Sequence, residues 1–233
     1  MTKILLGKTS FNLKKQILFS NLSGDSNPIH IDSIEARKSI AGECIVHGMH
    51  SFLWSLETLT NEIQYLFSNY EINFKRYIPL NFEVNCFWDP IEKKLTIEKG
   101  GIIFLLVRYY GGINNNLPKD WLLVNHEDTL KSPKVNALSK YKKGYKVFSI
   151  YGGDIETSKL LFPKLSSQVG VNLIYEISII SNIIGMQIPG YNSLFAKCKL
   201  SIKKELDIIP NFKITSFHKD LRFLKITYQG KNI

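Results

Sequence analysis

An aspartate and a histidine stand five positions apart in a loop that is rich in turn-forming residues. Asp25 follows Ser-Gly, and His30 follows Asn-Pro after one intervening isoleucine. Both dipeptides favour turns, and Asn27, which precedes a proline, is pushed toward extended geometry. Such a loop can direct the acid and the imidazole toward one point, where they could move a proton.

A His-Gly pair follows at the start of a predicted helix. Apolar residues recur at steps of three and four from position 49 onward, which predicts a helix over Gly48–Ser68. The first N–H groups of a helix have no acceptor within it, and the helix dipole places partial positive charge there. The Gly48 amide could therefore hold negative charge that develops on a carbonyl oxygen. With the acid and base of the loop, it would form a minimal set for proton transfer beside a carbonyl.

Each of these residues also has a purely structural interpretation. An aspartate after Ser-Gly is more often a turn or cap residue, and a single histidine more often packs in a core. A cluster of Asp, Asn and His could also hold a metal, but the carboxylates and imidazoles match no recognised ligand spacing. The combination favours catalysis, and we expect no metal.

The segment resembles the signature of the MaoC-like, R-specific enoyl-CoA hydratases (hydratase 2 family) of the hotdog fold. The pattern Ser-Gly-Asp-x-Asn-Pro-x-His-x-Asp is similar to residues 23–32, and Val-His-Gly-Met to residues 46–49. The resemblance continues through Phe74 and Pro79 and covers roughly residues 10–110. It implies that Asp25 and His30 are the catalytic pair and that the Gly48 amide contacts the thioester oxygen. Ser23, Asn27 and His47 would support the loop.

The implied activity is that of a lyase that adds or removes water across the α,β bond of an acyl thioester. The substrate would be an (R)-3-hydroxyacyl or enoyl thioester of coenzyme A or of an acyl carrier protein, with no further cofactor, and a homodimer is possible in this family. Two alternatives stay open. One is a hotdog thioesterase or acyl transferase acting on an acyl carrier, and the other is a non-catalytic subunit of a biosynthetic complex.

The sequence departs from the family pattern at several positions. Ser33 replaces the proline that usually follows the second aspartate, and Leu56, beside Ser55, falls where the family has a substrate-positioning serine. The second half of the chain has no Asp-x-Asn-Pro-x-His at all. By similarity to double-hotdog members, it is interpreted as a degenerate repeat that shapes the acyl pocket without doing chemistry.

The expected architecture is α+β, a tandem (double) hotdog in which each long helix is wrapped by an antiparallel sheet. Residues 1–112 would form the catalytic hotdog, 113–145 a basic linker, and 146–233 the degenerate hotdog. A second helix is expected over Ser167–Met186, because its apolar residues form one stripe. Strand-like runs separated by turn residues are Tyr70–Tyr77, Leu80–Trp88, Lys94–Glu98, Ile102–Tyr110, Lys146–Tyr151, Ser193–Lys203, Phe212–His218 and Leu221–Tyr228.

The composition is that of an ordinary globular chain. Of 233 residues, 44% are hydrophobic and 21% charged, which excludes a disordered or collagen-like chain. No apolar run reaches the roughly 18 residues of a membrane span, and no signal-peptide core develops at the N-terminus. Three widely spaced cysteines match no disulfide or metal pattern, so a reducing cytoplasm is expected.

The net charge of +10 is concentrated in part between residues 129 and 153, where lysines occur without an acid. The chain contains no nucleic-acid-binding motif, so we expect no nucleic-acid partner. We interpret these lysines as part of a solvated linker that also attracts an acidic carrier to some extent. Lys75 and Arg76 could contact a cofactor phosphate, although a solvated surface is the simpler interpretation.

Overall fold

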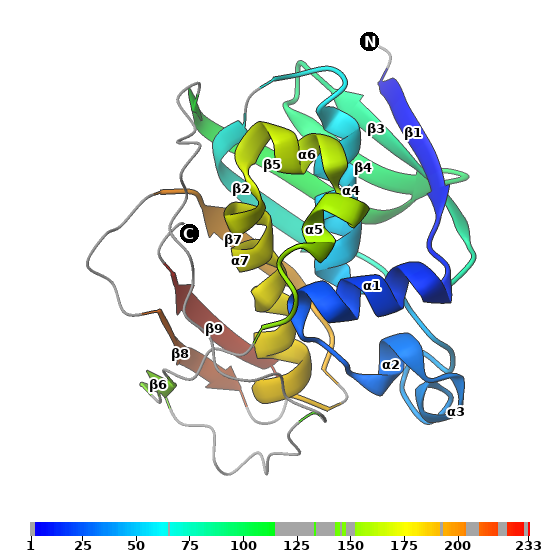
Figure 1. Ribbon diagram of the computed structural model, residues 1–233, viewed down its shortest axis with the longest axis vertical. Helices are drawn as coiled ribbons and strands as arrows, with labels where there is room; N and C mark the ends of the chain where they lie inside the picture. Colours follow the sequence, from blue (N-terminus) through cyan, green and yellow to red (C-terminus); the bar gives the residue numbers. More distant parts are fainter. Residues whose placement is uncertain are drawn as a thin grey trace.

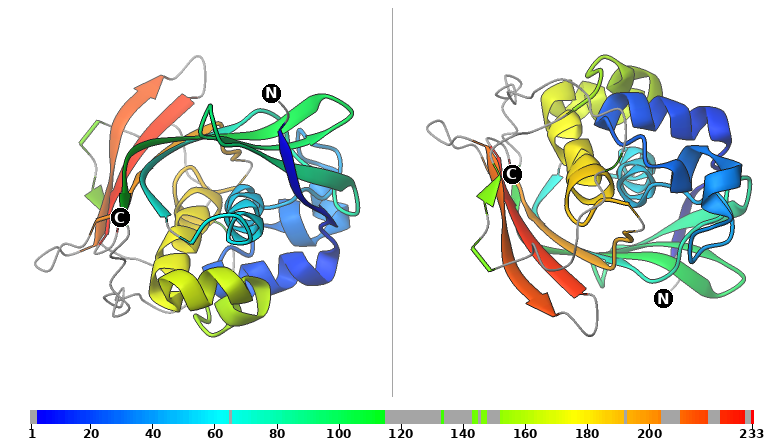
Figure 2. Two further views of the ribbon diagram at one scale, coloured as in Figure 1. Left: turned by 90° about the horizontal axis from the view of Figure 1, so that it is seen from above. Right: turned by 90° about the horizontal axis from the view of Figure 1, so that it is seen from below.

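The computed structural model describes residues 3–64, 66–114, 133, 143–144, 146–147, 152–191, 193–203, 210–218, 223–230 and 233. A six-stranded antiparallel sheet forms one side of the molecule, and the helices pack against its concave face (Figure 1, Figure 2). In spatial order its strands are β1 (Ile4–Ser10), β3 (Glu83–Asp89), β4 (Lys94–Lys99), β5 (Ile102–Asn114), β2 (Leu66–Phe74) and β7 (Lys197–Ser201).

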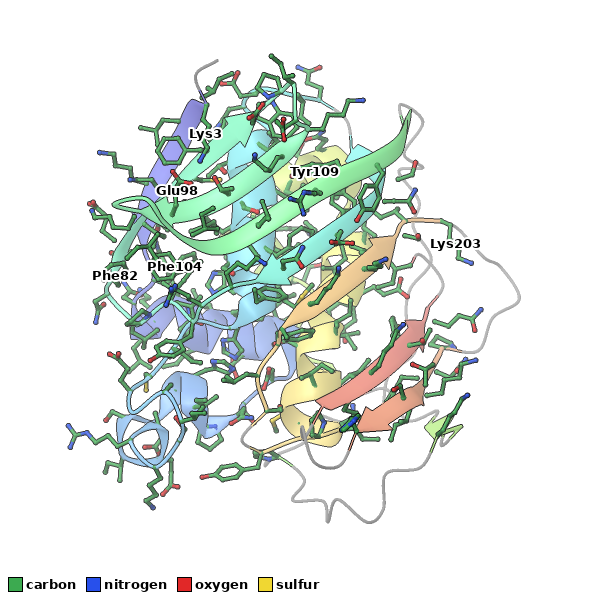
Figure 3. All side chains as sticks on the ribbon, turned by 180° about the vertical axis from the view of Figure 1, so that it is seen from behind. Lys3, Phe82, Glu98, Phe104, Tyr109 and Lys203 are labelled. Atoms are coloured by element: carbon green, nitrogen blue, oxygen red, sulfur yellow. The ribbon has the colours of Figure 1, made fainter. Side chains whose placement is uncertain are left out.

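Alternation along the strands decides which face of this sheet is buried. On β3, Val84, Cys86 and Trp88 are buried, whereas the residues between them are partly exposed. This period of two is what a strand with one face on the core requires. Figure 3 shows the opposite face, where Lys3 and Glu98 form an ion pair at 2.8 Å across β3.

A second, three-stranded sheet lies beyond β7 and extends the curved layer (Figure 1). It contains β6 (Lys146–Val147), β8 (Asn211–His218) and β9 (Phe223–Gln229), all antiparallel. Each strand-like run predicted from the sequence overlaps a strand of one of the two sheets. Residues 148–151 of the predicted run Lys146–Tyr151 lie outside the described residues.

Two central helices lie side by side beneath the large sheet (Figure 1, Figure 2). They are α4 (Gly48–Leu59) and α7 (Val171–Asn182), and a π-helical turn, Ile183–Gln187, continues α7. Their buried side chains belong to one hydrophobic core, which includes residues of both halves of the chain. The helices outside this pair are α1 (Leu13–Ser23), α2 (Pro28–Ile31), α3 (Ser33–Ala36), α5 (Thr157–Leu161) and α6 (Pro163–Val169).

The prediction that the first helix extends to Ser68 was wrong. Helix α4 ends at Leu59, and residues 66–74 instead form β2, which pairs with both β5 and β7. The apolar spacing that suggested a longer helix also suits a strand between two neighbours. Ladder hydrogen bonds on both edges outweigh a weak helical preference there.

The predicted helix Ser167–Met186 is also interrupted. Helix α6 ends at Gly170, whose φ of 82° and ψ of 153° are accessible to glycine but not to residues with a Cβ, and α7 starts at Val171. The expected apolar stripe is therefore divided between two helices. The structure also contains β1, α1 and α5, which the sequence analysis did not predict.

The two predicted hotdog units are joined directly through the large sheet. Strand β7 lies in the expected C-terminal unit, yet Cys198 pairs with Ile72 of β2. Most of the expected linker, residues 113–145, lies outside the described residues. The three cysteines are free.

In the described part of the chain, no single helix has the length and apolar character of a membrane span. Among the described residues, the helix pair Pro163–Val169 and Val171–Gln187 together has the length and composition of a span, but it is bent by 117°. Most of its second helix is buried within the protein.

The two halves are also connected at the end of α4. The Glu57 carboxylate accepts hydrogen bonds from the backbone N–H groups of Lys164 and Leu165, at 3.1 and 2.7 Å, in the first turn of α6. These donors have no acceptor within α6, and a negative charge at a helix N-terminus is favourable. Glu57 therefore caps a helix that lies more than a hundred residues further along the chain.

We predict that Glu57→Gln destabilises the protein by about 1–2 kcal/mol, because a neutral amide accepts more weakly than a carboxylate. Urea unfolding of the two proteins measures the difference. Glu62→Gln, at an exposed position just beyond α4, is the matched control and should leave the midpoint unchanged. Equal midpoints for both variants would contradict the capping role.

Candidate active site

The loop that contains the predicted acid begins at the end of α1. Asn12 caps the start of this helix by accepting a hydrogen bond from the Lys15 N–H, and Gly24 ends it with a left-handed φ of 71°. The Ser23 hydroxyl donates to the Phe19 carbonyl and accepts from the backbone N–H of Asp25. Ser23 thus bridges the last turn of α1 and the residue from which the Asp25 side chain projects.

The remaining residues of the motif build two short helices. The Asn27 side chain caps α2, which starts at Pro28, and the Asp32 carboxylate caps α3 by accepting two backbone N–H groups at 2.9 and 3.1 Å. Pro28 suits the first position of a helix, where its missing N–H is not needed. The second aspartate of the motif is therefore a capping residue, and Ser33 begins α3 without the usual proline.

Asp25 is almost completely buried, with 1% of its surface exposed. Its Oδ1 accepts from the Asn27 N–H at 3.2 Å, and its Oδ2 accepts from the Ser181 hydroxyl at 2.7 Å. Burial raises the pKa of Asp25 to about 7, because it penalises the charged form, while both hydrogen bonds act in the opposite direction. The carboxyl group can therefore exchange a proton near neutral pH.

His30 lies on α2 and is also buried. Its Nδ1 lies 2.8 Å from the Ile45 carbonyl oxygen, so Nδ1 carries the hydrogen and Nε2 keeps a free lone pair. Burial lowers the pKa of His30 to about 4, because the charged imidazolium is poorly solvated there. The ring is therefore neutral, with a basic nitrogen available.

His47 supports both of these residues. Its ring stacks on that of His30 with centroids 3.8 Å apart, and its Nε2 lies 3.0 Å from the backbone oxygen of Asp25. The Gln16 side chain of α1 holds His47 through its amide oxygen, which bonds the His47 backbone N–H and ring Nδ1. The amide nitrogen of Gln16 bonds His50 Nδ1. His47 thus links the motif loop to the start of α4.

A cavity of about 220 Å³ opens onto Asp25, His30 and Gly48. Gly48 is the first residue of α4, so its N–H has no acceptor inside the helix. A Cβ at this position would approach the Phe74 ring to 3.0 Å, so glycine keeps that side of the cavity open. The lining is otherwise largely apolar and includes Ile45, Val46, Phe74, Ile78, Phe104, Leu105, Ile184, Leu194 and Phe195.

The structure brings all six sequence-predicted site residues together at this cavity or directly behind it. Reactive atoms of Asp25, His30 and His47 lie within 4.8 Å of one another. A water molecule that bonds both a carboxyl oxygen and an imidazole nitrogen at about 2.8 Å fits this spacing. Ser55, beside the family's serine position, bonds its own helix, and Ser51 of α4 lines the cavity instead.

The second half of the chain supplies residues that the sequence analysis missed. Ser181, Gly185 and Ser193 line the cavity, and the Asn27 side-chain amide donates to the Gly185 carbonyl at 2.8 Å. The Asn182 side chain donates to the Gly24 carbonyl at 2.6 Å. No motif marks these residues. For Ser181, Asn182 and Gly185, the available signal was their polar or small character within the apolar run of the second predicted helix.

The cluster of Asp25, His30 and His47 was tested for its fit to a metal ion. A metal bound by both histidines must lie in both ring planes, about 2 Å from each nitrogen. The centroids of the two rings are 3.8 Å apart and their planes differ by only 27°. The two planes therefore meet much further than 2 Å from either nitrogen. The stacked arrangement of the two rings does not fit a metal ion that both histidines bind.

Two basic residues, Lys75 and Arg76, line the cavity next to Tyr77 and are exposed. Among the residues that the structure describes, neither forms an ion pair. They lie where β2 ends, so a group that extends out of the cavity would pass them.

Comparison with family models matches residues 8–84 to the MaoC like domain. No curated protein matches the chain. Among solved structures, a MaoC domain protein from Chloroflexus aurantiacus covers 100% of this chain and 87% of its own, with 9% identity and a TM-score of 0.62. A Mycobacterium tuberculosis protein with a double hotdog fold covers 90% of this chain and 80% of its own, with 8% identity and a TM-score of 0.54.

An (R)-hydratase from A. caviae involved in PHA biosynthesis covers 47% of this chain and 95% of its own, with 23% identity and a TM-score of 0.37. The full-length matches establish the double hotdog fold, which confirms the architecture predicted from the sequence.

We predict that Gly185→Ala lowers activity at this site by about 10²-fold or more. A Cβ on Gly185 would lie 2.6 Å from both carboxyl oxygens of Asp25 and would displace them, and a shift of about 1 Å in a reacting group has an effect of this size. The overpacking should also destabilise the protein by about 1–3 kcal/mol.

Turnover and urea unfolding measure these two effects. The matched control is Gly7→Ala, whose Cβ would meet Thr58 at an ordinary 3.4 Å and which should behave like the unchanged protein. Full activity in Gly185→Ala would show that the carboxyl group does not depend on this contact.

Proposed function

Because residues 8–84 form a MaoC-like domain within a double hotdog, we propose that this protein is an enoyl-thioester hydratase/dehydratase. One observation carries the proposal. An acid with a pKa near neutral and a neutral imidazole lie within 4.8 Å of each other in a cavity that also contains a free helix N–H. This is the set of groups that adding water beside a thioester carbonyl requires.

The environments of the two reacting groups assign their roles. When their surroundings shift the pKa values of two titratable groups in opposite directions, the group with the lower pKa is deprotonated and serves as base. The group with the higher pKa keeps its proton and serves as acid. In the hydration direction, His30 Nε2 takes a proton from water and the oxygen of that water bonds to Cβ of the substrate. The π electrons of the Cα–Cβ bond move toward the thioester carbonyl, and protonated Asp25 then delivers its proton to Cα. Dehydration is the reverse of these steps.

The thioester oxygen gains negative charge when the enolate forms. Gly48 lines the cavity at the start of α4, so its N–H could donate to this oxygen, and the helix dipole adds partial positive charge. A donor fixed in this way costs no rearrangement during the reaction. Replacing Gly48 would also bring a Cβ against Phe74, so this residue serves both the charge and the shape of the cavity.

The substrate is proposed to be an (R)-3-hydroxyacyl or enoyl thioester, with coenzyme A or phosphopantetheine as part of it. The apolar lining suits an acyl chain, and Lys75 and Arg76 suit the phosphate of either carrier. The cytoplasmic location and the homodimer stay predictions from the sequence.

We predict that the protein hydrates some members of a panel of enoyl-CoA and enoyl-carrier-protein thioesters, with loss of the conjugated-thioester absorbance as the measurement. Asp25→Asn and His30→Ala should each lower the rate by about 10²–10⁴-fold, because each removes a proton-transfer group. Chiral analysis of the product tests the (R) configuration.

A control for folding is available in the same variant. The raised pKa of Asp25 means that ionising it disfavours the folded state, so stability is lost as pH rises through about 7. Asp25→Asn should therefore be at least as stable as the unchanged protein at pH 8. Release of free thiol without hydration would point to a thioesterase, and near-normal turnover in either variant would remove the mechanism.

The hydration rate should depend on pH in a defined direction. The active form has Asp25 protonated and His30 neutral, so kcat/KM should fall as pH rises through about 7 and also as pH falls through about 4. Because the two groups are coupled, the apparent values belong to the pair. Activity that instead increases with pH through this range would reverse the assignment of acid and base.

A further inference from the structure

One segment of the second half, Ser181–Gly185, bonds the catalytic loop at three points around Asp25. Within these five residues, one side chain bonds the Asp25 carboxyl group, another bonds the Gly24 carbonyl, and a backbone oxygen accepts from Asn27. The Cα of Gly185 lies directly against the carboxyl oxygens. Asp25 is thus enclosed by residues that lie more than 150 positions away in sequence.

Ser181 differs from other buried serines on the central helices. Ser51, Ser55 and Ser178 each donate to a carbonyl three residues earlier in their own helix, the usual choice for a helical serine. The Ser181 hydroxyl instead donates out of its helix to Asp25 Oδ2, at 2.7 Å. A hydroxyl has only one hydrogen to donate, so this bond replaces the intrahelical one.

We propose that Ser181 is a positioning residue for catalysis, by which the half of the chain without a motif holds the Asp25 carboxyl group in its reacting orientation. One carboxyl oxygen accepts a hydrogen bond from the loop itself, through the Asn27 N–H. The other accepts one from Ser181, while His47 Nε2 lies 4.0 Å from it. Two donors on opposite oxygens fix the rotation of a carboxyl group, whereas one leaves it free to turn. This inference rests on the proposed role of Asp25.

The same bond sets when Asp25 gains and loses its proton. Hydrogen bonds to a carboxylate favour its ionised form, which opposes the effect of burial. The ionisable groups that face Asp25 are His30 on α2 and His47 before α4, and residues 181–187 contain none. Loss of the Ser181 hydroxyl should therefore raise the pKa of Asp25 without changing any nearby charge.

The test compares Ser181→Ala with Ser181→Thr, which keeps a hydroxyl. The matched control is Ser178→Ala, a buried serine of the same helix whose hydroxyl donates within its own helix. In Ser181→Ala we expect kcat for hydration to fall about tenfold or more with KM little changed. The upper limb of the pH profile should move up by about one unit, which corresponds to one charged hydrogen bond. Ser181→Thr should restore most of both properties, and Ser178→Ala should alter neither.

A carbon-13 NMR titration of the aspartate side chains supplies a measurement that needs no turnover. The Asp25 signal is identified by its loss in Asp25→Asn. If Asp25 titrates at the same pH in Ser181→Ala as in the unchanged protein, the positioning role is overturned, whatever the rates. If no thioester is hydrated but the titration moves as expected, the proposed function fails while the Ser181–Asp25 bond stands.

Discussion

The burial of one carboxyl group between the two halves of the chain is the constraint on which the site depends. Asp25 has 1% of its surface exposed, so each of its oxygens needs a donor from the protein. The motif loop supplies one donor and α7 the other. The loop can therefore hold its reacting geometry only when the second half is docked against it. The environment of Asp25 is thus completed by the second half of the chain, although that half contains no Asp-x-Asn-Pro-x-His motif of its own.

That docking is enforced at both ends of the central helix pair. The start of α4 and the end of α7 both line the cavity, whereas the end of α4 caps the start of α6 through Glu57. The two helices consequently run in opposite directions. At the cavity end Asp25 accepts a hydrogen bond from Ser181, and at the other end Glu57 accepts hydrogen bonds from the start of α6. Between these ends they share one apolar core, and β7 joins the large sheet through β2.

Locality decides which features could be predicted from the sequence. The loop from Ser23 to His30 was predictable because its geometry comes from residues within a few positions: a left-handed Gly24, a capping Asn27 and a proline at the helix start. The helix ends were less predictable, because apolar spacing does not distinguish the continuation of α4 from strand β2, whose partners are distant. Ser181 and Gly185 could not be identified, since each acts through one contact with a residue some 160 positions away. Only the folded topology makes that contact visible.

The antiparallel arrangement of α4 and α7 also gives the cavity an electrostatic direction. The N-terminus of α4 brings partial positive charge to the Gly48 end, and the C-terminal end of α7 brings partial negative charge to Asp25. A positive end suits an oxygen that becomes an enolate, and a negative end favours the protonated form of a carboxyl group. Burial raises the pKa of Asp25. The fold therefore separates the position that receives negative charge from the position that must keep a proton. This separation needs two helices, because one helix cannot present both of its ends to one cavity.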